Sequence, residues 1–256
     1  MKKLMLFAFM MVILAIGCAK TAKIQSNMDY RMDELSYENM SKPLVEKKGG
    51  TLAIGSFVVE EVLPPDTRVD KTSGFVVPLL FLNFWHYKYQ ASLGYDRIVN
   101  DYKQFMRESF IQEVRQGSLF AYAEDQGDFT VDVTINKIEI SAPIKQSGYI
   151  DVFPYLVGWN ENFEFGPLDV EVQADVVVKH DGAVVSNMKV QGKYKTDIDV
   201  KNLTWERTDL GVLMQDYTSV MIESLSLAIK DLNQNIVTMI NHEAGVLLLQ
   251  PLSRQR

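Results

Sequence analysis

An apolar segment at the N-terminus limits what the rest of the chain can be. Residues 4–16 carry no charge and no strongly polar side chain, Lys2 and Lys3 precede them, and Gly17 follows. A basic start, a short apolar run and a small residue are the features of a secretory signal peptide. The run is too short to cross a bilayer core of about 30 Å as a helix, which takes roughly 20 residues. The pattern therefore predicts an exported protein that loses residues 1–17, with a soluble secreted protein and an uncleaved anchor as alternatives.

Cys18 directly follows this segment and is the only cysteine of the chain. The run from Ala15 to Cys18, Ala-Ile-Gly-Cys, resembles the lipobox of bacterial lipoproteins, with alanine where leucine is more usual. The resemblance implies that lipid is attached to Cys18, that cleavage falls just before it, and that this anchor holds the protein to a membrane. In cells with two membranes, Ala19 in place of aspartate implies the outer membrane, facing the periplasm. The inner membrane and the cell surface stay open.

The charge of the processed chain narrows the choice of partner. The sequence has 26 basic and 33 acidic side chains, so loss of Lys2 and Lys3 leaves 24 against 33, a net charge of −9. Nucleic-acid phosphates attract Lys- and Arg-rich faces, so this acidity disfavours nucleic acid. With Cys18 acylated, no thiol remains for a disulfide or a thiolate metal site. We expect no nucleic-acid partner, no metal and no cofactor.

Several segments after residue 50 have the composition or period of β-strands. Thr51–Val62 is rich in β-forming residues. Leu168–Val178 alternates apolar with polar side chains, and the alternation resumes from Val184 to Ile198. Between these two segments, His180-Asp181-Gly182 is typical of a hairpin turn. The sequence therefore predicts an antiparallel hairpin with one buried and one solvated face.

The segment Phe129–Ala142 predicts a strand with an irregularity. Its apolar residues alternate up to Ile135 and then continue at Ile138, one residue out of phase. A strand cannot keep both sets on one face without an extra residue. We therefore expect a β-bulge near Asn136 and Lys137, and an end to the strand at Pro143.

Two further segments have the period of amphipathic helices, with apolar residues at spacings of three and four. They are Tyr95–Gly117 and Thr208–Asn241, the second with a break after Lys230 as an option. The apolar tail Gly245–Leu249 is expected to dock as an edge strand or against the helices.

The element order predicts the domain organisation. Residues 18–50 show no sustained period and predict a lipid-anchored flexible tether. Residues 51–256 then form a single α+β domain. Its order β-α-β-β-β-α favours a two-layer sandwich, in which two amphipathic helices cover one face of a four-stranded, mainly antiparallel sheet.

Two aromatic segments, residues 74–90 and 148–166, do not fit this plan. Each places a proline among aromatic and apolar side chains. A buried strand with its turn is one interpretation of the first segment. The other is that both are exposed loops that contact lipid or a membrane-protein partner, because aromatic rings favour a membrane interface. The predicted contact residues are Phe81, Phe84, Trp85, Tyr87, Tyr155 and Trp159.

No motif in the sequence predicts catalysis. His86, His180 and His242 are far apart, and residue 246 is valine where the zinc motif H-E-x-x-H needs a second histidine. Phosphate-binding loops, the nucleophile elbow and the dinucleotide motif have no match. Asp197 and Asp199 share a predicted strand face, where solvated charges are expected. We predict that the protein is not an enzyme, with a hydrolase of unrecognised site as the lesser alternative.

The order of elements resembles that of certain bacterial envelope lipoproteins. The auxiliary lipoproteins of ABC-type lipid transport systems and the lipopolysaccharide-assembly lipoprotein combine a lipobox, a polar segment and two helices on a four-stranded sheet. The likeness covers residues 51–241 in architecture alone, so it carries over no functional residue. It implies a non-catalytic binding or accessory subunit for a membrane-protein or lipid-transport partner. A structural protein that self-associates through apolar strand edges is the alternative.

Overall fold

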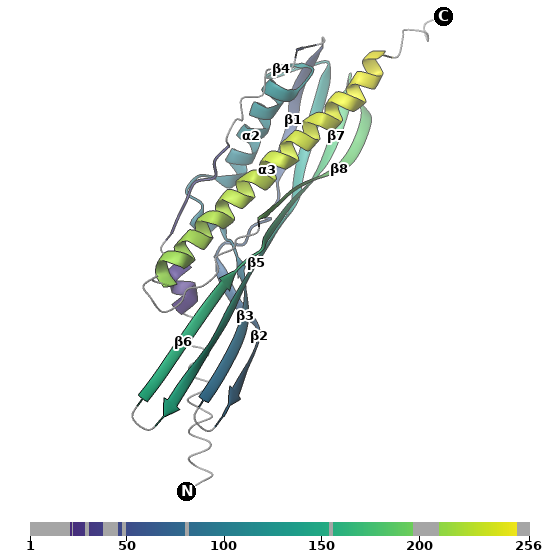
Figure 1. Ribbon diagram of the computed structural model, residues 1–256. Helices are drawn as coiled ribbons and strands as arrows, with labels where there is room; N and C mark the ends of the chain where they lie inside the picture. Colours follow the sequence, from purple (N-terminus) through teal and green to yellow (C-terminus); the bar gives the residue numbers. More distant parts are fainter. Residues whose placement is uncertain are drawn as a thin grey trace, which may run out of the picture.

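One long strand, β5 (Phe129–Phe153), runs through the whole sheet and joins its two halves (Figure 1). In its first half it pairs with β1 (Thr51–Val59) and β7 (Leu168–His180), and in its second half with β3 (Leu82–Ser92) and β6 (Leu156–Phe165). The computed structural model describes residues 21, 23–28, 31–37, 46–47, 50–79, 82–153, 156–196 and 210–249. Within these residues, eight strands form one mixed sheet.

The first half of the sheet is covered by helices on one face. Its strand order is β4-β1-β5-β7-β8, where β4 is Ala121–Ala123 and β8 is Ala183–Thr196. The pairs β1–β4 and β1–β5 are parallel, and the pairs of β7 with β5 and β8 are antiparallel. The helices α2 (Tyr102–Gly117) and α3 (Leu210–Leu249) lie side by side over one face (Figure 1). We call this part the covered half.

The apolar stripe of α3 explains why this long helix lies on the sheet. Residues at spacings of three and four turn one side of the helix towards the strands, where they are almost completely buried. They are Met214, Tyr217, Met221, Leu225, Ala228, Leu232, Ile236 and Ile240. Gly192 on β8 permits a close approach, because a Cβ atom there would lie 2.2 Å from the Ala228 carbonyl oxygen and 2.5 Å from the Leu232 Cβ.

Polar side chains fix α2 at both ends and against α3. Asp101 caps the N-terminus, where its carboxylate accepts hydrogen bonds from the backbone N–H groups of the first turn. At the C-terminus, the Asn241 amide donates to the Gly117 carbonyl oxygen at 2.9 Å and accepts from the Leu119 N–H at 2.8 Å. Asn241 on α3 thus provides hydrogen-bond partners for backbone groups that the C-terminal end of α2 leaves unpaired.

The second half of the sheet extends beyond the helices (Figure 1). It consists of β2 (Arg68–Pro78), β3, the second half of β5 and β6, in that order, and each neighbouring pair is antiparallel. It is therefore built from two hairpins, β2–β3 and β5–β6, which pair through β3 and β5. We call this part the hairpin sheet.

The structure confirms two local predictions. The register of β5 against β7 shifts between Ile135 and Lys137, and the extra residue, Asn136, donates a hydrogen bond to Asp175 on β7 at 2.8 Å. The turn between β7 and β8 has positive φ at Asp181 and Gly182, 49° and 79°, as expected for a two-residue hairpin turn of type I′.

The predicted four-stranded sandwich is wrong, because the sheet has eight strands in the described residues. Strands β2 and β3 occupy the first aromatic segment and the residues before it, for which a buried strand with its turn was one of the two interpretations, and β6 occupies the second aromatic segment. The strand β5 continues past Pro143, which falls where β5 exchanges β7 for β6 as its partner. A residue without an N–H donor is tolerated at such a change of partner.

The bounds of both helices also differ from the prediction. The segment Tyr95–Arg97 is a separate 3₁₀ turn, η1, and α2 starts only at Tyr102. The helix α3 has no break at Lys230 and continues to Leu249, so the apolar tail is helical. Thr208, the predicted start of this helix, lies outside the described residues.

Part of the predicted tether packs on the domain. Residues 23–28 are helical, and Ile24 and Met28 are buried. Leu35 is buried as well, and its backbone exchanges hydrogen bonds with the Asn100 side chain at 3.0 Å. These residues therefore belong to the folded core, because buried apolar side chains and paired backbone groups hold them there.

The contact of Gly192 with α3 can be tested by substitution. We expect Gly192→Ala to lower the free energy of unfolding by about 1–3 kcal/mol, because the added methyl group would overlap the α3 backbone. Gly158→Ala on β6 is the matched control, since its Cβ would find its nearest neighbour at 3.5 Å. Chemical denaturation of both variants measures the difference, and equal stability would contradict this packing.

Candidate functional site

The strand register gathers exposed apolar side chains on one face of the hairpin sheet. Val77 on β2 lies opposite Phe84 on β3, and Phe84 lies opposite Tyr149 on β5. Directly opposed residues share a face, as do residues two apart on a strand, so Phe75 belongs to the same group. We call these four side chains, Phe75, Val77, Phe84 and Tyr149, the apolar face.

These side chains are exposed although two of the rings pack together. Their exposed fractions are 58% for Phe75, 41% for Val77, 40% for Phe84 and 37% for Tyr149. The Phe84 and Tyr149 rings are 6.1 Å apart between centroids, and the Phe75 ring lies 5.7 Å from His86. Leu79, at the end of β2, is 53% exposed and extends the group towards the tip. Contiguous apolar patches of this kind mark contact surfaces for partners or membranes.

On the opposite face of the hairpin sheet, aromatic rings pack over glycines of the neighbouring strands. A Cβ atom on Gly148 would lie 2.5 Å from the Trp85 indole, and one on Gly74 would lie 2.1 Å from the Tyr87 ring. Each ring therefore covers a cross-strand neighbour that has no side chain, which is a recognised way to stabilise glycine in a sheet. Trp85 and Tyr87 thus support the sheet from the face behind the apolar face.

A polar network links three strands of the hairpin sheet near its base. The Tyr89 hydroxyl donates to Gln146 at 2.7 Å, and the Gln146 amide donates to Glu161 at 2.5 Å. The Thr21 side chain also hydrogen-bonds with Tyr89. Burial, followed by the negative charges that Tyr87 and Glu161 can carry, raises the pKa of Tyr89 to about 12, although the Thr21 hydrogen bond opposes the shift. The network spans β3, β5 and β6 and holds them in one register.

In the covered half, the face of the sheet that points away from the helices carries charged side chains. Lys179 pairs with Asp132 and Lys193 with Glu171, at 2.5 and 3.2 Å. The apolar face is thus confined to the part of the sheet beyond the helices, and charged side chains separate it from the other end of the molecule.

Not all predicted contact residues lie on the exposed surface. Phe84 lies on the apolar face, and Trp159 on β6 is 49% exposed on the opposite face. Trp85 is partly buried over Gly148. Tyr87 is only 6% exposed, so its prediction as a contact residue is corrected: the ring is part of the core. Phe81 and Tyr155 lie outside the described residues, as do Cys18, Asp197 and Asp199.

Sequence reasoning did not single out Phe75, Val77 or Tyr149. Phe75 and Val77 are two residues apart, and that period was the available signal. This period was obscured because Val76 lies between the two residues and Pro78 follows Val77. Both are also apolar, so the stretch shows no alternation.

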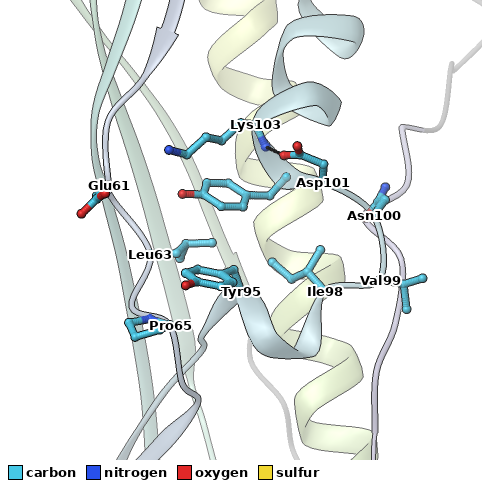
Figure 2. A pocket seen from close by; sticks show the side chains of 10 residues that line it. Glu61, Leu63, Pro65, Tyr95, Ile98, Val99, Asn100, Asp101 and Lys103 are labelled. Carbon is cyan, nitrogen blue, oxygen red and sulfur yellow. Dashed lines mark hydrogen bonds between the residues drawn. The ribbon is translucent and has the colours of Figure 1, made fainter.

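A groove near the start of α2 is the second candidate site (Figure 2). It has a volume of about 570 Å³ and lies between the segment of Glu61, Leu63 and Pro65 and the segment from η1 to α2. The rings of Tyr95 and Tyr102 stack inside it, 6.2 Å apart between centroids and inclined by 14°. A groove of this size can hold a small molecule.

The groove does not support the hydrolase alternative. Its acidic lining residues are Glu61 and Asp101, and its lining residues include no histidine. Asp101 already accepts two backbone hydrogen bonds as the cap of α2. His180 lies at the β7–β8 turn, and His242 contacts Glu243 on α3 at 3.5 Å, so neither faces these carboxylates. In the described part of the chain, no three acidic, histidine or cysteine side chains are grouped as metal ligands.

Comparisons with known proteins give little further guidance. No protein-family model matches the chain, and no curated protein matches it. A solved structure that does match is a Xanthomonas campestris protein of the family DUF330. It is 10% identical, with a TM-score of 0.41 over 85% of this chain and 97% of that chain. A similarity this low assigns neither fold nor function.

Among the described helices, none combines the length and apolar character needed to cross a membrane.

The Tyr89 network predicts a specific loss of stability at high pH. The folded protein holds the Tyr89 proton up to about pH 12, whereas the ordinary pKa of tyrosine is 10. Below pH 10 both states keep the proton and stability is unaffected. As pH rises from 10 towards 12 the unfolded chain ionises first, so the free energy of unfolding falls.

Chemical denaturation from below pH 10 to just under pH 12 measures this effect. We expect a steeper loss for the wild type than for Tyr89→Phe, because the variant lacks the Tyr89 hydroxyl that ionises first in the unfolded chain. Parallel losses would contradict a buried, protonated Tyr89.

Proposed function

We propose that the chain is a lipid-anchored envelope lipoprotein, outer-membrane and periplasm-facing, that acts as a non-catalytic binding or accessory subunit. In this proposal the apolar face of the hairpin sheet is the surface that contacts a membrane-protein partner or lipid. The observation that carries the proposal is the exposure of four contiguous apolar side chains on a part of the sheet that no described helix covers.

The distance between Cys18 and the fold supports a contact at the membrane. Thr21, three residues after Cys18, hydrogen-bonds with Tyr89 at the base of the hairpin sheet. Each residue spans at most about 3.6 Å, so a lipid on Cys18 lies within roughly 11 Å of Thr21. An anchor this close holds the hairpin sheet at the membrane surface, where apolar rings have lipid or membrane protein as neighbours.

The chemistry of the apolar face agrees with this role. Aromatic rings with some polar character are favoured where lipid headgroups meet hydrocarbon, and the face includes Tyr149 and lies beside His86. The processed chain is acidic, so attraction to anionic lipid is not the driving force. Burial of apolar surface is therefore the interaction that would bind this face to its partner.

The anchor itself is tested by removing its attachment point. Wild-type protein isolated from membranes should partition into detergent and carry a lipid-sized mass increment on Cys18. Cys18→Ser should lose both, because the acylated thiol is absent. Intact-mass measurement of the two proteins decides the point, and identical masses after processing would refute lipidation.

The apolar face is tested by making it polar without disturbing the core. We expect Phe75→Ser combined with Phe84→Ser to weaken binding by roughly tenfold or more. The two rings are 58% and 40% exposed, so together they have about one full ring left to bury. Full burial of one ring is worth about 1.5 kcal/mol or more, and each 1.4 kcal/mol is a factor of about ten. The measurements are recovery of membrane-protein partners in mild detergent and, with Cys18→Ser protein, binding to zwitterionic phospholipid vesicles.

A matched control uses exposed apolar residues far from the hairpin sheet. Val184 and Val185 on β8 are 61% and 38% exposed, so Val184→Ser with Val185→Ser removes similar surface from the covered half. This control should keep wild-type binding. Equal loss in both double variants, or no loss in either, would contradict a role for the apolar face.

A further inference from the structure

The two outer strands of the hairpin sheet are unpaired on one side. Within the described residues β2 pairs only with β3 and β6 only with β5, so each presents a row of backbone N–H and C=O groups. The edge of β2 is occupied at its base, where Val69 donates to Gln25 at 2.8 Å, and no other described strand pairs with it from there to Pro78. Unpaired edges of this length are templates for another strand.

The directions of these strands match for pairing between copies. β2 and β5 run away from the helices, and β3 and β6 run back towards them. If β6 of one copy lies beside β2 of the next, with both hairpin sheets pointing the same way, the two strands are antiparallel. The new contact therefore continues the alternation of strand direction that is already present within each copy.

The composition of the two edges is complementary. β6 carries Glu161 and Glu164 and no basic residue, whereas β2 carries Arg68 and Lys71 against one acid, Asp70. Trp159 on β6 is 49% exposed and lies in the same row as Pro78 at the other edge. If the residue rows of the two copies line up across the contact, the Trp159 indole would pack on Pro78 and the nearby Val76 of the next copy.

The remaining long edge lacks these properties. β8 carries Lys189, Lys193 and Lys195 on alternate positions, which is a common protection against pairing. Only the hairpin sheet therefore combines two open edges with matching direction and opposite charge.

We propose that copies of this chain associate head to tail, with β6 of one copy added to β2 of the next. Such a contact uses two different surfaces, so it repeats from copy to copy instead of stopping at a dimer. It does not depend on the identity of any partner of the apolar face. The interaction is between backbone groups, and the packing of Trp159 on Pro78 sets its register.

Cysteine cross-linking of the lipidated, detergent-solubilised protein tests this contact. The register places Ser73 and Glu164 at opposite ends of one row, and Val77 and Asn160 at opposite ends of another. We expect the double variants Ser73→Cys with Glu164→Cys and Val77→Cys with Asn160→Cys to form ladders of dimers, trimers and higher species with a short bismaleimide. Each single variant should stay monomeric, because head-to-tail contact never brings identical positions together.

Controls separate this contact from other associations. Ser73→Cys with Lys189→Cys, which uses the β8 edge, should stay monomeric, and wild-type protein gives the background from Cys18. Thermal unfolding of each variant confirms that it is folded. Dimers from Glu164→Cys alone would overturn the proposal in favour of a symmetric β6–β6 contact. Absence of a ladder from both folded double variants, together with a concentration-independent monomer mass for the wild type, would also overturn it.

Discussion

The backbone hydrogen bonding of β5 is the constraint on which the rest of the structure depends. Its 25 residues pair with β1 and β7 on one stretch and with β3 and β6 on the next. Because one strand belongs to both halves, the hairpin sheet cannot shift without moving the covered half. The bulge at Asn136 keeps the apolar side chains of β5 on the helix-facing side from Val131 to Ile144. The position of the apolar face is therefore fixed by packing at the other end of the sheet.

The sequence predicted those features that local pattern determines. The alternation along β7, the hairpin turn at Asp181 and Gly182, and the bulge at Asn136 each follow from residues adjacent in the chain. The sequence left a buried strand open for residues 74–90 but did not predict a sheet of two paired hairpins, because strands with apolar side chains on both faces show no alternation and prolines at their ends favour loops. The folded position of residues 23–28 was missed because only contacts distant in sequence, such as Gln25 with Val69, hold them.

The same distinction applies to the candidate site. Aromatic composition identified the two segments and, within them, Phe84 and Trp159, which are exposed. It could not show that Tyr87 is buried, because that depends on Gly74 lying opposite it on another strand. The composition of a segment thus indicates that it has apolar surface to bury. The register with other strands decides which side chains remain available to a partner.

The surroundings of the hairpin sheet connect the two proposals. Lipid hydrocarbon offers no hydrogen-bond partners, so an open strand edge that enters it costs several kcal/mol for each unpaired backbone group. If the hairpin sheet lies at lipid depth, the edges of β2 and β6 need partner strands. A neighbouring copy supplies them without any change within the chain. If the sheet instead remains in water, its edges are solvated and pairing them gains less free energy, so association depends more on the packing of Trp159 on Pro78.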